Sequence, residues 1–254
     1  TLQAPDPAIA DMFGFTTTQF AKDFEVKKEV IRLRKEEFGI DVKIVEKLYA
    51  NGEIAKGEKI NVVVPTGNFG NILAAYFAKQ MGVPIAKLIC ASNDNKVLYD
   101  FFETGVYDKN REFILTISPS MDILISSNLE RLVYMIAGCD AKKNSELMKA
   151  LKEKGVYELT DDMKANLSDF AAGYATEEEV KAKIADVYKK TGYVMDTHTA
   201  VAAHVCEKYQ KESGDARKTV IASTASPYKF SRSVMTAIDA RYEGLDEFDL
   251  VDAL

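Results

Sequence analysis

Two glycines between an expected strand and an expected helix are the clearest sign of chemistry in this sequence. Residues 62–64 are valines, Gly67 and Gly70 follow, and residues 72–79 have the composition of a helix. The first N–H groups of a helix have no partners within it, and the helix dipole favours negative charge there. We therefore expect residues 67–71, called the glycine turn below, to bind an anion such as phosphate through backbone amides.

The spacing of the glycine turn narrows the class of ligand. It matches neither the G-x-x-x-x-G-K-[ST] loop of nucleoside-triphosphate sites nor the G-x-G-x-x-G fingerprint of dinucleotide sites. Glycine has no Cβ, so the backbone can approach a ligand closely at Gly67 and Gly70. The alternative is a tight turn in which glycine only relieves strain, and the local pattern does not separate the two.

Four blocks of the sequence, taken in order, resemble threonine synthase, a pyridoxal-phosphate (PLP) enzyme of the tryptophan-synthase-β-like fold. The resemblance runs from about Tyr49 to about Asp239 and covers only the C-terminal portion of a typical family member. The blocks are Pro65-Thr66-Gly67-Asn68-Phe69-Gly70-Asn71, Ser118-Pro119-Ser120-Met121-Asp122-Ile123 leading into Ser126-Ser127-Asn128-Leu129-Glu130-Arg131, Asp196-Thr197-His198-Thr199-Ala200-Val201-Ala202, and Ser223-Thr224-Ala225-Ser226-Pro227-Tyr228-Lys229-Phe230.

This resemblance implies an α/β fold. We expect a three-layer, open, mostly parallel sheet flanked by helices, as in fold-type II PLP enzymes, here partial and with a helical insertion at about residues 121–190. The resemblance also implies that the cofactor is pyridoxal 5'-phosphate, which acts as an electron sink. The implied reaction converts O-phosphohomoserine and water to threonine and phosphate, a carbon–oxygen lyase reaction of amino-acid biosynthesis.

The resemblance assigns roles to individual residues. Amides of the glycine turn should hold the cofactor phosphate, and the hydroxyl of Thr224 should meet the pyridine nitrogen. Lys229 should pair with the substrate phosphate, because a lysine is a compact point charge suited to a dianion. The expected cofactor-binding residues are Gly67, Asn68, Phe69, Gly70, Asn71 and Thr224, and the expected substrate-binding residues are Ser126, Ser127, Asn128, Arg131 and Lys229.

Most of these residues also have an ordinary structural explanation. We expect the Phe69 ring to anchor the turn in the core, and Ser223 and Thr224 could be helix N-caps at a strand end. Residues 126–131 fit a capped helix in which Arg131 lies one turn beyond Ser127 or Asn128, so they can share a face. A solvent-facing position is the commoner fate of a single lysine such as Lys229.

Asp196 and His198 stand where a helix should begin. Asp196 is a good N-cap residue, and His198 is a candidate for orienting a neighbouring loop or lining the site. His204 falls on a different face of the same helix, so we expect no metal site from the two histidines.

A catalytic lysine is the missing part. In this family PLP forms a Schiff base with a lysine in a Ser-Phe-Lys-Asp-type motif, upstream of the glycine turn, and the sequence has no such motif. Residues 1–48 match no family segment and have the composition of a charged helical region; residues 49–254 form the expected partial PLP-binding domain. We expect this chain alone to be inactive unless a separate N-terminal half complements it, and we expect either that half or a homo-oligomer as its protein partner. The alternatives are a non-catalytic protein that binds PLP or another phosphate ligand, and a nucleotide-binding module.

Composition bounds the other possibilities. With 254 residues, of which 47% are hydrophobic and 28% charged, the chain can bury a full core. Its net charge of −6 gives no basic excess for nucleic acid or anionic membranes. We recognise no signal peptide and no apolar run of about 18 residues. Cys90, Cys139 and Cys206 are odd in number, which favours buried free thiols in the cytoplasm over disulfides or zinc.

The surrounding pattern predicts alternating strands and helices. A parallel βαβ unit with a right-handed crossover is the default for the first two strands. We expect strands at residues 60–64, 86–91 and 219–222, and helices at 17–38, at 72–79 and from a cap at 92–95 through 102. Residues 140–154 and 176–190 are rich in lysine and glutamate and predict exposed helices.

Overall fold

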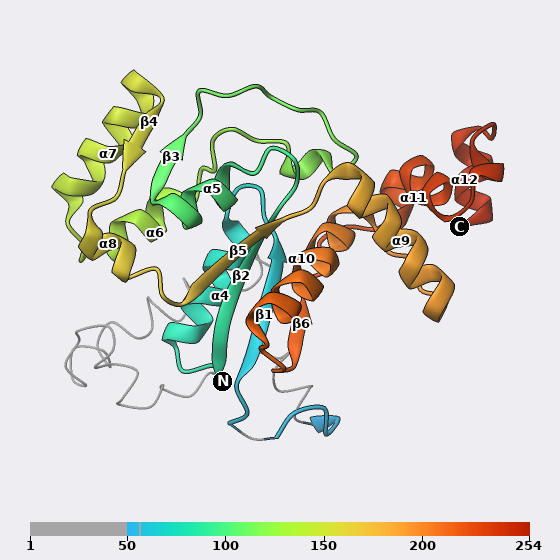
Figure 1. Cartoon of the computed structure of the whole chain (residues 1–254), viewed down its shortest axis with the longest axis horizontal. Helices are drawn as coiled ribbons and strands as arrows, with labels where there is room; N and C mark the ends of the chain where they lie inside the picture. The colour runs from blue at the N-terminus through green and yellow to red at the C-terminus, as the bar shows by residue number, and fades with distance from the viewer. Residues whose placement is uncertain (1–49, 56) are drawn as a thin grey trace, which may run out of the picture.

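The computed structural model describes residues 50–55 and 57–254, so the helix and the separate region expected within residues 1–48 lie outside the described residues. The main sheet has four parallel strands in the order β5-β2-β1-β6 (Figure 1). These strands are β1 (Ile60–Pro65), β2 (Ile85–Ser92), β5 (Phe170–Tyr174) and β6 (Thr219–Ile221). A second, antiparallel pair joins β3 (Val106–Asp108) to β4 (Val156–Glu158).

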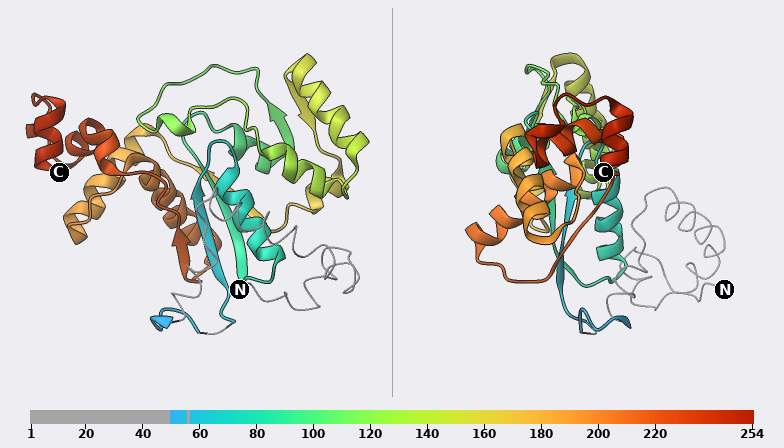
Figure 2. Two further views of the ribbon diagram at one scale, coloured as in Figure 1. Left: turned by 180° about the vertical axis from the view of Figure 1, so that it is seen from behind. Right: turned by 90° about the vertical axis from the view of Figure 1, so that its right-hand side faces the viewer.

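Two hydrophobic clusters lie on opposite faces of the main sheet, because successive side chains of a strand point to opposite sides. Val62 and Val64 pack with α4 (Gly70–Gln80), α5 (Val97–Thr104) and α6 (Leu129–Ile136). Val63 packs with α9 (Glu177–Thr191), α10 (Thr197–Ser213) and α11 (Ser231–Ile238). The predicted three layers are therefore confirmed, and the views from behind and from the side show helices on both faces (Figure 2). The remaining elements are α7 (Ala141–Lys154), α8 (Asp161–Ala165), α12 (Glu247–Ala253), and the short 3-10 helices η1 (Pro119–Met121), η2 (Pro227–Phe230) and η3 (Ala240–Tyr242).

The predicted strands and helices around the glycine turn are present, and residues 121–190 are mostly helical, as predicted, although they also contain strands that the prediction did not include. That stretch carries four helices, α6 to α9, and also β4 and β5. The middle of β5 (residues 171–173, Ala-Ala-Gly) has little intrinsic strand preference, whereas Phe170 and Tyr174 at its ends are residue types that favour strands. Its partner explains it: a Cβ on Gly173 would lie 2.7 Å from Cγ1 of Val205, so α10 packs directly on this bare strand. Tertiary packing determined β5, not local propensity.

The helix cap predicted at residues 92–95 is also wrong. The N-cap residue of α5 is Lys96, with φ 35°, and no side chain caps that helix. The two asparagines bind a distant loop instead. Asn93 Nδ2 donates to Oδ1 of Asp122 at 2.7 Å, and Asn95 Nδ2 donates to the same oxygen at 3.1 Å.

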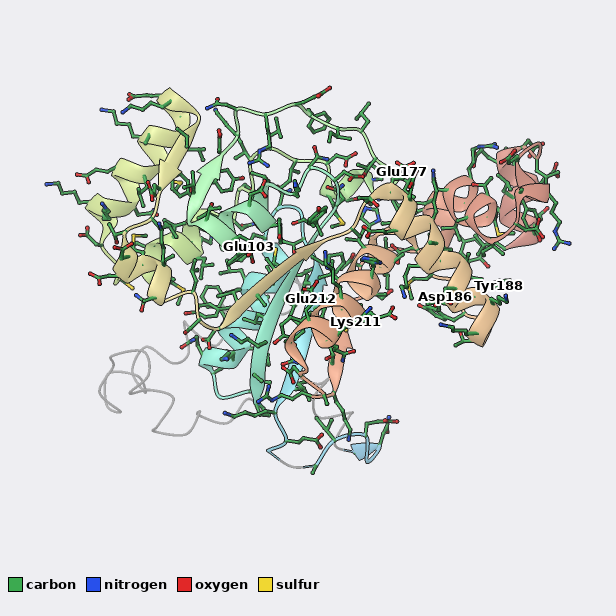
Figure 3. All side chains as sticks on the ribbon, in the orientation of Figure 1. Glu103, Glu177, Asp186, Tyr188, Lys211 and Glu212 are labelled. Atoms are coloured by element: carbon green, nitrogen blue, oxygen red, sulfur yellow. The ribbon has the colours of Figure 1, made fainter. Side chains whose placement is uncertain are left out.

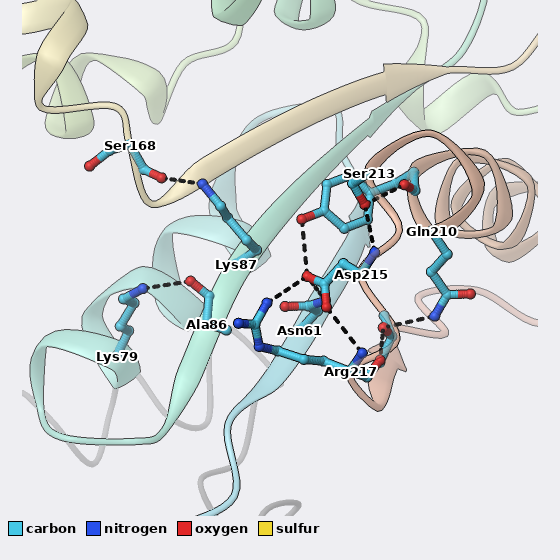
Figure 4. Close-up of polar contacts among 11 residues, drawn as sticks. Asn61, Lys79, Ala86, Lys87, Ser168, Gln210, Ser213, Asp215 and Arg217 are labelled. Atoms are coloured by element: carbon cyan, nitrogen blue, oxygen red, sulfur yellow. Dashed lines mark hydrogen bonds and ion pairs between the residues drawn. The ribbon is translucent and has the colours of Figure 1, made fainter.

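A polar cluster stabilises the start of β1, at the opposite end of the sheet from the glycine turn (Figure 4). Asn61 is fully buried, and its Nδ2 donates to Oδ2 of Asp215 at 3.0 Å. Arg217 Nη1 donates to the same carboxylate oxygen at 2.9 Å. The amide of Asn61, together with hydrogen bonds and charge from Arg217, lowers the pKa of Asp215 to about 2 although desolvation opposes the shift.

The outer faces of α9 and α10 are charged, as predicted for residues 176–190. Side chains such as Asp186, Lys211 and Glu212 project outward from these helices (Figure 3), and Lys190 forms a 2.8 Å ion pair with Asp186. None of the described helices is long and apolar enough to cross a membrane. All three cysteines are free thiols, but Cys139 is exposed, which corrects the expectation that all three are buried.

Candidate functional site

The glycine turn connects the end of β1 to the start of α4. Thr66 N–H donates to the carbonyl of Ala91 at 2.8 Å and extends the pairing with β2. Phe69 has a left-handed φ of 61° and a side chain that is 1% exposed. Its ring lies 6.0 Å from that of Phe102 and 6.1 Å from that of Phe170, between ring centroids. The prediction that Phe69 anchors the turn in the core is confirmed.

The carbonyl groups of the turn are held from one side. Ser126 Oγ donates to the carbonyl of Gly67 at 2.8 Å, while the backbone N–H and the Nδ2 of Asn128 donate to the carbonyl of Asn68 at 3.1 and 2.8 Å. In a trans peptide the N–H points opposite to the carbonyl of the same plane. The N–H groups of Asn68 and Phe69 must therefore point away from Ser126 and Asn128.

These amides form a donor group suited to an anion. Within the described part of the chain, the N–H groups of residues 68–72 have no hydrogen-bond acceptor. No side chain caps α4 and its first turn contains no acidic residue, so nothing on this helix competes with an external negative charge. Unpaired N–H groups and the positive end of the helix dipole together favour phosphate or carboxylate binding.

A cavity of about 340 Å³ opens over this helix end. Thr224 and Lys229, which come from the loop after β6, line it together with the glycine turn. Both residues are exposed, and Lys229 places Nζ 5.5 Å from the centroid of the Phe230 ring. The structure thus brings the predicted anion donors, a hydroxyl and a lysine to one opening. Neither Ser223 nor Thr224 caps a helix, because the first residue before η2 is Ser226.

A turn at residues 118–122, called the serine turn below, forms another wall of this cavity through Ser120 and Met121. It is held by a polar network in which Asp122 accepts from Asn93, Asn95 and Thr116. A Cβ on Gly67 would lie 2.5 Å from the carbonyl oxygen of Ser120. Gly67 is therefore required for contact with the serine turn, a reason the sequence did not reveal.

His198 also lines the cavity. This position is one of the two that the sequence analysis gave for it. Asp196 caps α10 as expected: its Oδ1 accepts from the N–H groups of His198 at 2.9 Å and Thr199 at 3.1 Å. Burial acts to raise the pKa of Asp196, but hydrogen bonds from His198 and Thr199 outweigh it and lower the pKa. His204 lies elsewhere, with Nε2 3.5 Å from Glu179. The described residues contain no group of three or more histidine, cysteine or acidic side chains arranged for a metal ion.

The four predicted substrate residues of α6 and its preceding loop lie behind the glycine turn, among residues that do not line the cavity. Ser126 and Asn128 bind the carbonyls of the turn, and Arg131 donates through Nη1 to Oδ1 of Asn128, so the predicted shared face exists. Ser127 is exposed. Substrate contact by these residues stays a prediction.

Comparison with known proteins agrees with this architecture. The family model described as "Threonine synthase, C-terminal" matches residues 199–252. Threonine synthase-like 1 of Pongo abelii is 44% identical over 193 residues, which are 75% of this chain and 26% of that protein. Threonine synthase of Saccharomyces cerevisiae is 37% identical over an aligned length of 203 residues, and the alignment covers 74% of this chain and 39% of that protein.

Solved structures give the same result. PLP-bound threonine synthase from Brucella melitensis superposes with a TM-score of 0.71 at 32% identity and covers 97% of this chain and 50% of its own. Threonine synthase from yeast gives a TM-score of 0.70 at 33% identity, covering 80% of this chain and 44% of its own. The chain therefore spans half or less of the length of these relatives.

The parallel sheet, its two helical layers and the glycine turn at the carboxyl end of β1 give this chain the fold of the type II PLP enzymes. Within that class it is a partial match to threonine synthase. The portion it shares with that family is the C-terminal one.

Proposed function

We propose that the glycine turn binds the phosphate of pyridoxal 5'-phosphate and that this chain forms part of a threonine synthase-like enzyme. The observation that carries the proposal is the donor group of residues 68–72, whose N–H groups have no acceptor among the described residues at the open end of α4. These groups fit a phosphate, since they supply donors and a positive dipole with no opposing acid. The PLP-bound relative from Brucella melitensis supports the choice of cofactor.

Within the proposed enzyme, the residues of this chain hold and orient the cofactor and the substrate. The glycine turn would bind the cofactor phosphate, and the Thr224 hydroxyl would face the cofactor ring from the loop after β6. Lys229, at the same opening, would attract the phosphate of O-phosphohomoserine by charge. Bound PLP would supply the electron sink for the reaction. We retain Ser126, Ser127, Asn128 and Arg131 as proposed substrate residues. Ser126 and Asn128 also donate hydrogen bonds to carbonyl groups of the glycine turn.

The proposed overall reaction, from O-phosphohomoserine and water to threonine and phosphate, belongs to the whole enzyme. No lysine occupies a Ser-Phe-Lys-Asp-type motif in this sequence, so we propose that the chain alone binds the cofactor without turnover. A complementing N-terminal half would supply the missing base, whereas a second copy of this chain would not, because it lacks the same motif. The free cysteines support a reducing, cytoplasmic setting.

Calorimetric titration tests the binding step. Pyridoxal phosphate and inorganic phosphate should bind competitively, while pyridoxal without its phosphate should bind much more weakly. Equal affinities for pyridoxal and its phosphate would contradict the assignment of the turn as the phosphate site. Competition by ATP with higher affinity than pyridoxal phosphate would favour the nucleotide-binding alternative.

A charge substitution at the turn sharpens this test. Asn71 lies in the first turn of α4 and lines the cavity. Asn71→Asp should therefore weaken phosphate binding by about tenfold or more, because the new carboxylate repels the phosphate. The same carboxylate should stabilise the fold by about 0.3–1 kcal/mol through its interaction with the helix dipole. Gln80→Glu adds the same charge at the other end of α4 and serves as the matched control. Equal losses of affinity in the two variants would indicate a general charge effect instead of a site.

Activity is tested separately. The chain incubated with pyridoxal phosphate and O-phosphohomoserine should release no phosphate, and addition of the N-terminal half of a threonine synthase should restore release. Phosphate release by the chain alone would show that another lysine serves as the base.

A further inference from the structure

The serine turn was not assigned a role by the sequence, yet it forms a wall of the cavity. Ser120 and Met121 face the opening, and the carbonyl of Ser120 lies against Gly67. Its position therefore sets how far the glycine turn can move. A ligand gripped by several backbone amides needs those amides held to a fraction of an ångström.

Besides Ser118, whose hydroxyl lies 3.4 Å from Asn93 Nδ2 and 3.2 Å from Thr116 Oγ1, the serine turn is fixed at two further points. One is Asp122, whose carboxylate is held by the network of Asn93, Asn95 and Thr116. The other is Ser120, whose backbone N–H donates to Nε2 of His198 at 3.2 Å, across 78 residues of sequence. His198 is thus the only described side chain that binds the backbone of Ser120, at the residue nearest the glycine turn.

The surroundings of His198 fix the position of its ring. Because Nε2 accepts a hydrogen bond, the proton of the neutral ring lies on Nδ1. Nδ1 faces Oγ1 of Thr197 at 3.2 Å and Oδ1 of Asp196 at 3.5 Å, and the ring packs on Phe230 with 4.8 Å between centroids. The side chain is 2% exposed, so it has little freedom to turn away.

We propose that His198 is a positioning residue, whose Nε2 lone pair fixes the Ser120 amide and so holds the serine turn against the glycine turn in the geometry that binds phosphate. The effect of His198 on ligand binding rests on the proposed function of the glycine turn. The effect of His198 on the position of the serine turn does not depend on that function. Phe230 links the same imidazole to the loop that carries Lys229, so His198 contacts two walls of the cavity.

The test compares a variant that keeps an acceptor with one that lacks it. His198→Gln retains a side-chain oxygen that can accept from Ser120, whereas His198→Leu leaves that N–H unpaired. The control is His204→Leu, because His204 is the other of the two histidines, lies on the same helix and does not line the cavity. Two quantities are measured on the full chain: the affinity for pyridoxal phosphate by calorimetry, and the hydrogen-exchange rate of the Ser120 amide by NMR.

We expect His198→Leu to weaken pyridoxal phosphate binding by about tenfold and to speed Ser120 exchange by at least as much, in line with the loss of one hydrogen bond. His198→Gln should stay within about threefold of the parent in both, and His204→Leu should change neither. Unchanged Ser120 exchange in a folded His198→Leu variant would overturn the proposal. So would equal losses in the Gln and Leu variants when both fold, since the ring and not its acceptor would then matter. If the parent binds no pyridoxal phosphate, the proposed function fails, and the Ser120 exchange rates alone decide the positioning role.

Discussion

Replacement of Gly67 by alanine should damage the site although its backbone conformation suits any residue. No left-handed φ is found at Gly67, so strain in the backbone is not the reason. The reason is space: the added Cβ would lie 2.5 Å from the carbonyl oxygen of Ser120 and 3.4 Å from Cα of Met121. Both obstacles are backbone atoms, which cannot rotate away as the end of a side chain can.

The size of the effect follows from the required movement. A Cβ to oxygen distance of at least 3.0 Å needs a shift of 3.0 − 2.5 = 0.5 Å, and an ordinary contact of 3.4 Å needs 0.9 Å. Such a shift strains either the Ser120 bond to His198 or the Ser126 bond to the Gly67 carbonyl. Overpacking of this kind costs about 1–3 kcal/mol, and the lower entropy of the unfolded alanine chain returns about 0.4–1 kcal/mol. We expect Gly67→Ala to lower the free energy of unfolding by about 1–2 kcal/mol.

Urea denaturation measures this loss, and calorimetry should show pyridoxal phosphate binding weakened by about tenfold or more. Gly244→Ala is the matched control, since a Cβ there meets nothing within 4 Å and Gly244 has no left-handed φ. The control should be neutral or slightly stabilising. A Gly67→Ala variant as stable as the control, with undiminished affinity, would refute the contact between the two turns.

Three further outcomes are expected. As pH falls from about 4 to about 2, the chain should lose about 1 kcal/mol of stability through Asp215, a loss that solvent screening limits. The pKa of Asp215 is lowered in the folded chain, so its carboxylate stabilises the fold fully above the pKa of about 3.9 of the unfolded chain and less below it; urea curves of Asp215→Asn should lack this component. A thiol reagent at neutral pH should label Cys139 and not Cys90, because burial raises the pKa of the Cys90 thiol to about 12. Mass spectrometry of the native chain measures the labelling, and labelling of both thiols would contradict the burial of Cys90. Ser126→Ala should cost about 1 kcal/mol by leaving the Gly67 carbonyl with one donor fewer, and an unchanged urea midpoint would argue against that bond.

Local pattern was enough to predict part of the fold. The strand at residues 60–65, the glycine turn and α4 follow from a valine run, two glycines and a helix-forming segment within twenty residues. Asp196 was predicted as an N-cap and its carboxylate does accept from the first amides of α10. Such features depend on neighbours a few residues apart, which a sequence displays directly.

Local pattern failed where distant packing decides. Alanine and glycine in β5 carry no strand signal, and the strand exists because α10 covers Gly173. Asn93 and Asn95 have the composition of a helix cap, yet they bind Asp122, which stands 29 and 27 residues away. A short polar side chain can satisfy a nearby backbone or a remote carboxylate equally well, so only the folded chain selects between them.

The sequence by itself determined that a helix with unpaired first amides would follow the two glycines, since that depends on chain geometry within one turn. Only the tertiary structure decided what surrounds those amides. Ser126 reaches the Gly67 carbonyl across 59 residues, and His198 reaches Ser120 across 78. Gly67 follows β1, Ser120 and Ser126 lie between β3 and α6, and His198 lies at the start of α10. Only the folded chain brings these segments together, and no spacing along the chain encodes that arrangement.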